Sequence, residues 1–161
     1  MGMDKDKVNV LNEKTGKYFI RLKLSNADNK KVWDLMAIYG AAQSEQKAEF
    51  LTELAKEFYS QGSPLVVGGD FNILRKESEK NKIGGYTKWS FIFNSIIDQA
   101  NLREVQMSGR QFTWCNFQNS PTLEKLDRVF INNEWEDIYP LTTVRTLVRA
   151  MSDHNPMLME T

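Results

Sequence analysis

The chain has 161 residues, of which 41% are hydrophobic and 11% aromatic, a composition typical of one globular domain and not of a disordered segment. Its 21 basic and 21 acidic residues give a formal net charge of zero, which argues against a nucleic-acid binder that relies on bulk positive charge. A single cysteine excludes an internal disulfide framework and a cysteine-based zinc site, and it fits a reducing, intracellular setting.

Alternating apolar and polar residues predict two strands in the first part of the chain, at residues 17–24 and 32–39. The polar segment 25–31 between them is typical of a hairpin turn. Ahead of the first strand, residues 12–16 are also expected to form a turn. Residues 43–61 carry apolar residues at helical spacing, and a Gly-Ser-Pro sequence ends this predicted helix.

Residues 65–72, Leu-Val-Val-Gly-Gly-Asp-Phe-Asn, predict a strand that is buried on both faces and ends in two polar side chains. The two glycines remove side chains where another group must approach the backbone. Asp70 and Asn72 are two residues apart, so an extended chain would point both the same way. An acid and an amide side by side could bind a metal-bound phosphate or a water nucleophile. Alternatively, the two residues form only an Asx turn without a functional role.

The rest of the chain alternates short apolar runs with polar loops. A polar loop is expected at 73–86 and an amphipathic helix at 87–101. Further strands are predicted at 102–105, 111–115, 125–131, 142–148 and 156–159, with a short helical piece at 132–139. We expect Trp89, Trp114 and Trp135 to be core residues. The mixture predicts an α/β (α+β) sandwich with helices on its outer faces, in one domain over residues 1–161. No apolar run approaches the roughly 18 residues that span a bilayer, so no membrane partner is expected.

Three further residues could take part in catalysis together with Asp70 and Asn72. They are Asp127, Asp153 and His154, the only histidine. Hydrolysis of a phosphoester needs an activated water and neutralisation of the charge that develops on the phosphoryl oxygens. Carboxylates with a hard cation, or an imidazole beside a carboxylate, can meet these needs. Asp127 lies in a predicted central strand, where a carboxylate requires a partner, and either His154 or Arg128 could be that partner. The segment around His154 could instead be a loop with ordinary capping interactions.

Five short motifs follow one another along the chain. They are Ile38-Tyr39-Gly40, Gly69-Asp70-Phe71-Asn72, Phe112-Thr113-Trp114, Leu126-Asp127-Arg128 and Ser152-Asp153-His154-Asn155-Pro156. In this order they resemble the endonuclease/exonuclease/phosphatase superfamily, and most of all the apurinic-type endonuclease domain of plant LINE (non-LTR) retrotransposons. The Phe-Thr-Trp and Leu-Asp-Arg motifs favour that branch over lipid or inositol-phosphate phosphatases. The motifs span residues 38–156, and the resemblance implies part of a four-layer α/β/β/α sandwich.

The resemblance implies roles for the matching residues on the side of the nucleophile and the phosphate. Asp70 would position or activate the attacking water, and Asn72 would stabilise the phosphoryl transition state. Tyr39 would contact the phosphate, in an Ile-Tyr-Gly-Ala segment that lacks the family's proline. His154 would contact the scissile phosphate, and Asp127 would orient that histidine by a hydrogen bond.

The resemblance also implies a divalent cation, Mg²⁺ or Mn²⁺, with Asp153 as a ligand. A complete family domain begins with a strand that carries an Asn and continues to a segment like Gln-Glu-Thr, whose Glu is a principal metal ligand. Neither segment precedes Tyr39. Glu13 lies in a predicted turn and is a poor replacement. We therefore expect that the first portion of the domain is missing and that the cation is held weakly, if at all.

The sequence thus predicts a divalent-metal-dependent phosphodiester hydrolase of retrotransposon descent, similar to an endonuclease, with weak or no activity as this fragment. The implied partner is DNA, and the implied location is nuclear if the domain functions. The alternative is a catalytically dead remnant that acts as a folded interaction module. A missing first portion would expose an inner sheet face and a sheet edge, so self-association through that face is also expected.

Overall fold

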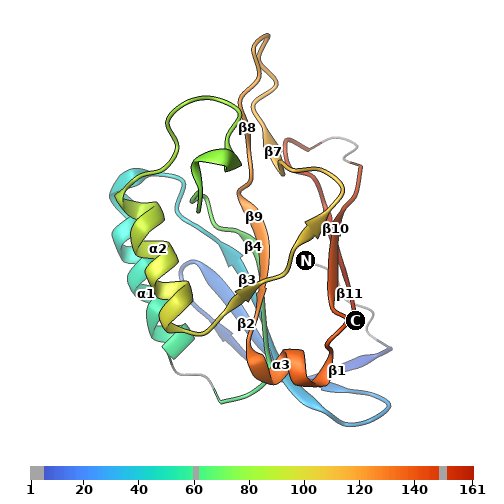
Figure 1. Ribbon diagram of the computed structural model, residues 1–161. Helices are drawn as coiled ribbons and strands as arrows, with labels where there is room; N and C mark the ends of the chain where they lie inside the picture. Colours follow the sequence, from blue (N-terminus) through green and yellow to red (C-terminus); the bar gives the residue numbers. More distant parts are fainter. Residues whose placement is uncertain (1–5, 60–61, 149–151) are drawn as a thin grey trace.

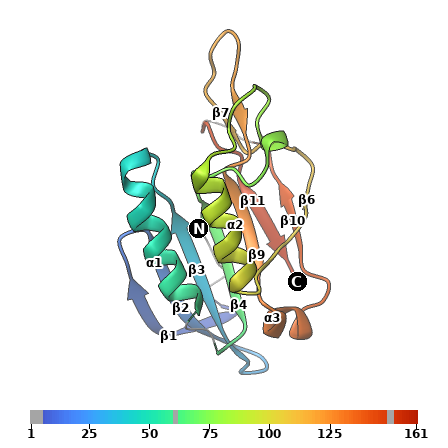
Figure 2. The same ribbon diagram turned by 60° about the vertical axis from the view of Figure 1, so that its left-hand side comes forward.

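The structure, a computed structural model, describes residues 6–59, 62–148 and 152–161, which form a sandwich of helices and two sheets (Figure 1). Helices α1 (Lys47–Tyr59) and α2 (Lys88–Gln99) lie side by side on one face of a six-stranded sheet. A three-stranded sheet lies against part of the other face, as the turned view shows (Figure 2). The predicted mixed α+β sandwich is therefore confirmed. In the described ranges, no helix is long and apolar enough to cross a membrane.

The six-stranded sheet has the order β1-β2-β3-β4-β9-β5. Its strands are β1 (Val8–Thr15), β2 (Phe19–Asn26), β3 (Val32–Tyr39), β4 (Leu65–Asp70), β9 (Asp127–Ile131) and β5 (Arg103–Glu104). All neighbours are antiparallel except β3 and β4, which run parallel. Helix α1 provides the crossover that a parallel pair requires.

The remaining elements are short. The second sheet has the order β11-β10-β6 and consists of β6 (Met107–Ser108), β10 (Thr143–Thr146) and β11 (Met157–Glu160). A separate hairpin pairs β7 (Trp114–Cys115) with β8 (Leu123–Glu124). Two 3-10 turns, η1 (Ser44–Gln46) and η2 (Glu77–Glu79), and a short helix α3 (Asn133–Ile138) complete the fold.

Strand β1 contradicts one prediction. Residues 12–16 were expected to form a turn, but 12–15 belong to an eight-residue strand paired with β2, and the turn follows at Gly16, whose N–H donates to the carbonyl of Phe19. The apolar pattern of β1 is weak because it is an edge strand with little burial, and Val10 is 56% exposed. Such a strand is specified by pairing with its neighbour more than by its own hydrophobicity.

The two faces of the large sheet bury two separate cores. On the helix face, Val67 and Phe130 of the sheet pack with Phe50 and Phe93 of the helices. On the other face a second cluster, which includes Val66, packs between the sheets. Strand β4 alternates between the two cores, which confirms the prediction of a strand buried on both faces.

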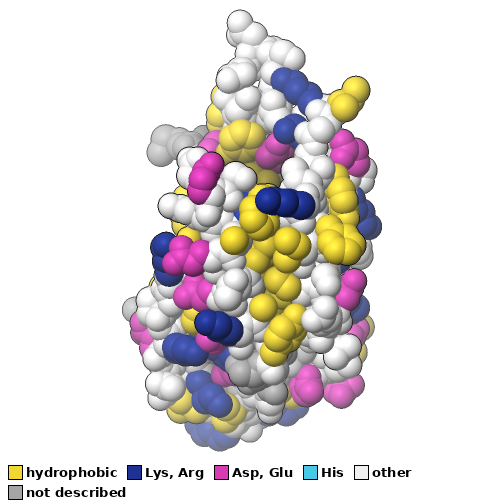
Figure 3. Space-filling view, turned by 90° about the vertical axis from the view of Figure 1, so that its left-hand side faces the viewer, with side chains coloured by type: hydrophobic (Ala, Val, Ile, Leu, Met, Phe, Trp, Pro, Cys, Tyr) yellow, Lys and Arg dark blue, Asp and Glu magenta, His cyan; other side chains and the backbone are white. Residues whose placement is uncertain are grey.

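An apolar strip runs along the outer surface of the helix layer, between α1 and α2 (Figure 3). Its apolar side chains are Leu51, Ala55 and Tyr59 on α1 and Trp89, Ile92 and Ile96 on α2. Trp89 is half-buried and packs against the helix-face core, in accord with its predicted place.

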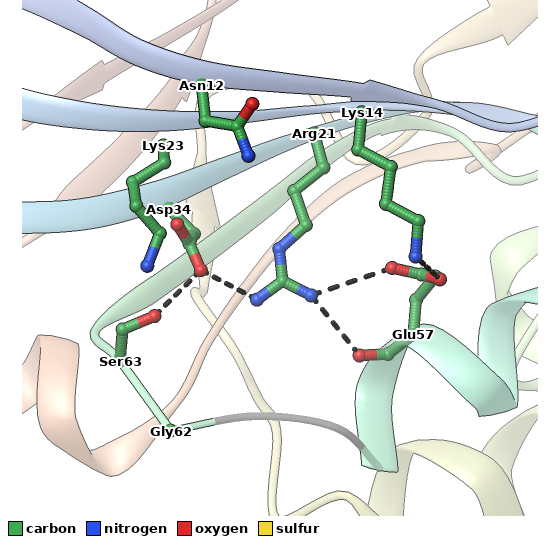
Figure 4. A pocket seen from close by; sticks show the side chains of 8 residues that line it. All are labelled: Asn12, Lys14, Arg21, Lys23, Asp34, Glu57, Gly62 and Ser63. Atoms are coloured by element: carbon green, nitrogen blue, oxygen red, sulfur yellow. Dashed lines mark hydrogen bonds and ion pairs between the residues drawn. The ribbon is translucent and has the colours of Figure 1, made fainter.

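A cluster of charges joins the last turns of α1 to strands β2 and β3 (Figure 4). Arg21 donates to Asp34 at 2.6 Å and pairs with Glu57, which Lys14 also contacts. The hydroxyl of Ser63 donates to the same Asp34 carboxylate at 2.7 Å. These charges are paired with one another, so we interpret the cluster as a structural one that fixes the helix layer to the sheet.

Arg128 is fully buried on the helix face of β9, where it pairs with Glu79 and Glu104. Successive residues of a strand point to opposite faces, so Arg128 points away from Asp127. The alternative that Arg128 is the partner of Asp127 is therefore wrong. Although burial opposes it, the charge of Arg128, with that of Lys125, lowers the pKa of Glu104 to about 2. Arg128 also donates to the carbonyl of Ile73, which fixes the loop after β4 to β9.

We expect Arg128→Met to lower the free energy of unfolding by about 3–5 kcal/mol, because it leaves Glu79 buried without its cation. Arg145→Met is the matched control, since it removes an ion pair with Glu160 at the surface. The Arg145 side chain is 52% exposed and that of Glu160 is 58% exposed. That change should be below about 1 kcal/mol. Urea unfolding followed by tryptophan fluorescence measures both variants, and equal losses would contradict a structural role for the buried pair.

Candidate active site

Asp70 and Asp127 face each other across strands β4 and β9. Asp70 is the last residue of β4 and Asp127 the first of β9, so both lie at one end of the sheet and on one face. Both side chains are mostly buried. Burial, reinforced by the charge of Asp127, raises the pKa of the Asp70 carboxyl. This direct pairing of two carboxylates was not foreseen from the sequence.

Two glycines allow the backbone around Asp70 to close up. Gly69 has a φ of 142°, and an added Cβ would lie 2.1 Å from the carbonyl oxygen of Ile38. At Gly40 an added Cβ would lie 2.4 Å from the carbonyl oxygen of Phe71. The expected close backbone approach is therefore confirmed at Gly69, and Gly40, which lies outside that expectation, allows a second one.

Asn72 folds back onto Asp70. Its N–H donates to Oδ1 of Asp70 at 2.8 Å, and its Nδ2 donates to Oδ2 of Asp70 at 2.9 Å and to the carbonyl of Gly40 at 3.0 Å. The expected extended chain is wrong at this point, because β4 ends at Asp70 and Asn72 has a left-handed φ of 51°. The two side chains meet through an Asx-type turn, so the turn and the site are the same feature.

His154 lies between the two carboxylates. Its Nδ1 is 2.8 Å from Oδ2 of Asp127, and its Nε2 is 3.9 Å from Oδ2 of Asp70. Of the two partners considered for Asp127, the structure places His154 against it. The hydrogen bond with Asp127 raises the pKa of the imidazole, although partial burial opposes the shift. The pair can hold a proton at Nε2, on the side that faces Asp70.

The Phe-Thr-Trp segment brings His154 and Asp127 together. The buried hydroxyl of Thr113 accepts hydrogen bonds from the N–H groups of Leu126 and Asp127, both at 3.0 Å. The Thr113 carbonyl accepts from the N–H of Asn155 at 2.7 Å. Thr113 is thus a positioning residue that sequence reasoning missed. Its position in the Phe-Thr-Trp motif could have pointed to Thr113. The motif alone did not indicate that the hydroxyl accepts backbone hydrogen bonds.

Trp114 is not a core residue, contrary to the prediction. It is half-buried, and its indole N–H donates to Oδ2 of Asp153 at 2.9 Å. This hydrogen bond lowers the pKa of the Asp153 carboxyl, which is exposed to solvent. Trp135, in contrast, is buried in the core between the sheets as predicted.

Tyr39 and Glu13 differ in their distance from the site. Tyr39 ends β3 as the direct partner of Asp70, and it is 74% exposed, so its side chain is accessible beside the carboxylates. Glu13 lies on β1, three strands away, in the row of paired residues that includes Val66. Strand spacing and rise per residue put it roughly 20 Å from Asp70. Glu13 therefore lies too far from Asp70 to bind the same cation.

The donor set for a divalent cation is incomplete. Among the residues that the structure describes, no group of three or more His, Cys, Asp or Glu side chains could hold a metal ion. Asp70 accepts two hydrogen bonds from Asn72, and Asp127 holds His154, which leaves Asp153 as the exposed carboxylate of the site. Mg²⁺ can bind through one or two carboxylates when phosphate and water supply the other ligands. The residues present thus fit only a weakly held cation near Asp153.

The hydrogen bond between Asp127 and His154 generates a testable pH dependence. Since His154 is the only histidine, its imidazole gives a single NMR titration curve. We expect its pKa to lie above the ordinary value of about 6.5, and to fall toward that value in Asp127→Asn. A raised pKa contributes stability that is present below the unfolded-state pKa and is lost as pH rises through the folded-state pKa. This decline should be weaker in the variant.

Asp153→Asn is the control for that titration. Asp153 acts on the imidazole only through its charge, and it contributes least to the raised pKa of His154. It should lower the pKa of His154 less than Asp127→Asn does. A wild-type pKa at or below the ordinary value would contradict the paired geometry.

Comparisons with known proteins bear on the family and the fold of the chain. A family model described as "Endonuclease/Exonuclease/phosphatase family" matches residues 5–154, a range that includes both carboxylates, Asn72 and His154. None of the curated protein sequences matches the chain.

Three solved structures illustrate the likeness in fold. The endonuclease domain of TRAS1, a telomere-specific non-LTR retrotransposon, has 16% identity and a TM-score of 0.73, with 97% of this chain and 69% of that one covered. A mannosyl-6-phosphatase from Bacteroides thetaiotaomicron has 15% identity and a TM-score of 0.63, with 97% and 67% covered. Beta toxin from Staphylococcus aureus has 16% identity and a TM-score of 0.62, with 90% and 57% covered.

At these identities the likeness shows the fold alone, and the chain spans only part of each relative's length. The family match covers most of the chain and agrees with the resemblance read from the five motifs. The chain belongs to the endonuclease/exonuclease/phosphatase family.

Proposed function

We propose that this chain is a phosphodiester hydrolase domain of retrotransposon descent, which cleaves DNA weakly when a divalent cation is supplied. The observation that carries the proposal is the imidazole of His154, fixed by Asp127 at 2.8 Å and directed toward the Asp70 carboxylate. DNA is proposed as the substrate because the fold is similar to a retrotransposon endonuclease domain. A nuclear location is part of the same proposal, since that is where a retrotransposon endonuclease meets its substrate.

The residues divide the chemistry between them. Asp70 has a raised pKa and would accept the proton of an attacking water. His154, kept protonated by Asp127, would donate a hydrogen bond from Nε2 to a phosphoryl oxygen. As the water oxygen bonds to phosphorus, the bond from phosphorus to the leaving ester oxygen would break, and the leaving oxygen would take its proton from solvent. A bound divalent cation would supply further neutralisation of the charge on the phosphate. Tyr39, exposed beside Asp70, would contact the phosphate.

Asn72 has a narrower role in this state than the resemblance implies. Its amide donates to Asp70 and to the carbonyl of Gly40, so both Nδ2 hydrogens are engaged. In this arrangement Asn72 orients the carboxylate of Asp70. To stabilise a phosphoryl oxygen as well, the amide would have to release one of these two acceptors.

The alternative is a catalytically inactive remnant that acts as a folded interaction module. The observation that favours it is the incomplete metal site, since the described residues gather no three ligands and Asp153 is held by Trp114. The two proposals agree on the fold and differ on whether the His154–Asp70 pair turns over substrate.

Nicking of supercoiled plasmid in the presence of Mg²⁺ decides between them. We expect slow nicking that chelation with EDTA abolishes. Asp70→Asn and His154→Ala should each reduce the rate by about 100-fold, since the first removes the general base and the second removes a charged donor to the phosphate. Glu13→Gln is the matched control, because this carboxylate lies on β1, far from the site, and its loss should leave the rate unchanged.

Nicking that persists equally in Asp70→Asn and His154→Ala would point to a contaminating nuclease and would contradict the proposed site. Absence of nicking in the folded wild-type protein would establish the remnant. Circular dichroism of each variant verifies that the comparison is between folded proteins.

We also propose that the chain self-associates through the part of the inner sheet face that the small sheet does not cover. There Val10 is 56% and Ile20 is 45% exposed, and among the described residues no strand pairs with the outer side of β1. Sedimentation velocity should show dimers or larger species at high concentration, and the double variant Val10→Lys, Ile20→Lys should be more monomeric. Phe91→Lys, at an exposed site on α2, is the control. A wild-type protein that stays monomeric at all concentrations would contradict the proposal.

A further inference from the structure

Lys47, the first residue of α1, joins the two loops that surround Asp70. Its ammonium donates to the carbonyl of Ala41 at 3.0 Å and to the carbonyl of Asn72. Ala41 follows β3 and Asn72 follows β4, so one side chain ties together the ends of two parallel neighbours. None of the five motifs includes Lys47, and the sequence did not indicate it as a candidate site residue.

The setting of Lys47 is unusual for a lysine. Lysines normally keep their ammonium in water, whereas this side chain is half-buried. Burial lowers its pKa, and in the described ranges no ion pair joins it to a carboxylate. The charge is satisfied by carbonyl oxygens of the two loops. A half-buried cation held in this way restricts both loops, because releasing either carbonyl leaves the ammonium with fewer acceptors.

Asn72 is where this restriction matters. Its left-handed backbone, with φ at 51°, is uncommon for a residue other than glycine, although asparagine adopts it more readily than most. That conformation turns the Asn72 amide back onto Asp70. The loop is also closed by the N–H of Gly40, which donates to the Asp70 carbonyl at 2.7 Å. Lys47 holds the opposite side of the same turn through the carbonyl of Asn72.

We propose that Lys47 is a positioning residue for the Asp70–Asn72 pair, which it acts on through the Asn72 carbonyl. The inference deepens the hydrolase proposed above and rests on it for its catalytic consequence. The structural part, that Lys47 maintains the turn at Asn72, can be measured without any turnover.

Three variants test the role: Lys47→Met removes the donor, Lys47→Arg keeps a donor that can reach both carbonyls, and Lys56→Met is the matched control. Lys56 lies on the same helix, is exposed, and lines the apolar strip away from the site. The first readout is native-state hydrogen exchange of the Asn72 N–H, which is bonded to Asp70, compared with the core amide of Val67.

We expect Lys47→Met to speed exchange at Asn72 by about tenfold or more while exchange at Val67 stays unchanged. Lys47→Arg and Lys56→Met should exchange as the wild type does. The second readout is hydrolysis of bis(4-nitrophenyl) phosphate with Mg²⁺. There Lys47→Met should lower kcat by about tenfold with little change in KM, because a misplaced group costs rate more than binding. Lys47→Arg should restore most of that loss.

The two readouts separate failure of this inference from failure of the proposed function. If the wild-type protein does not hydrolyse the diester, the hydrolase proposal fails, and exchange at Asn72 alone decides the role of Lys47. If Lys47→Met keeps both slow exchange at Asn72 and wild-type kcat, the inference is overturned while the hydrolase stands. Faster exchange at Asn72 and Val67 alike would assign Lys47 to general stability and would also overturn it.

Discussion

The pairing of β4 with β9 is the constraint from which the site follows, because it sets Asp70 directly opposite Asp127. Two carboxylates at opposed positions of an antiparallel pair repel each other, and burial adds to the penalty of keeping both ionised. The imidazole of His154 relieves this by bonding one carboxylate and facing the other. On the other face of the same two strands, Arg128 neutralises the charge of the buried Glu79 carboxylate. One register thus fixes both the candidate chemistry and the main buried ion network.

The side chains that touch Asp70 and Asp127 are held by others that carry no chemistry themselves. Thr113 binds the start of β9 and receives the N–H of Asn155, so the segment that carries His154 is fixed against the segment that carries Asp127. Lys47 performs the equivalent task on the β4 side through the carbonyl of Asn72. Both act on backbone groups, which explains why a search for catalytic residue types passes over them. Precision of a few tenths of an ångström at a site depends on such supports.

The sequence was sufficient to predict those elements whose structure follows from a regular pattern of neighbouring residues. Strand β3 and helices α1 and α2 follow from apolar periodicity, and the residues of the site follow from motifs whose order is specific. It was insufficient where a partner from elsewhere in the chain decides. The exposed edge strand β1 has little hydrophobic pattern of its own, and the side chain of Trp114 is directed by Asp153. The left-handed turn at Asn72 depends in the same way on the carbonyl of Gly40 and the ammonium of Lys47, which come from two other segments.

The hydrogen bonding of the site bears on how a cation would bind. Asn72 donates to Asp70, and His154 is paired with Asp127, so these interactions compete with a cation for the carboxylate oxygens. A cation near the exposed Asp153 would then lack most of its ligands until a phosphate arrives with its own oxygens. Metal and phosphate would each raise the affinity of the other, because each completes the other's coordination. The protein alone should therefore bind Mg²⁺ poorly, and poor binding in the absence of a phosphodiester is not evidence that the His154–Asp70 pair is inert.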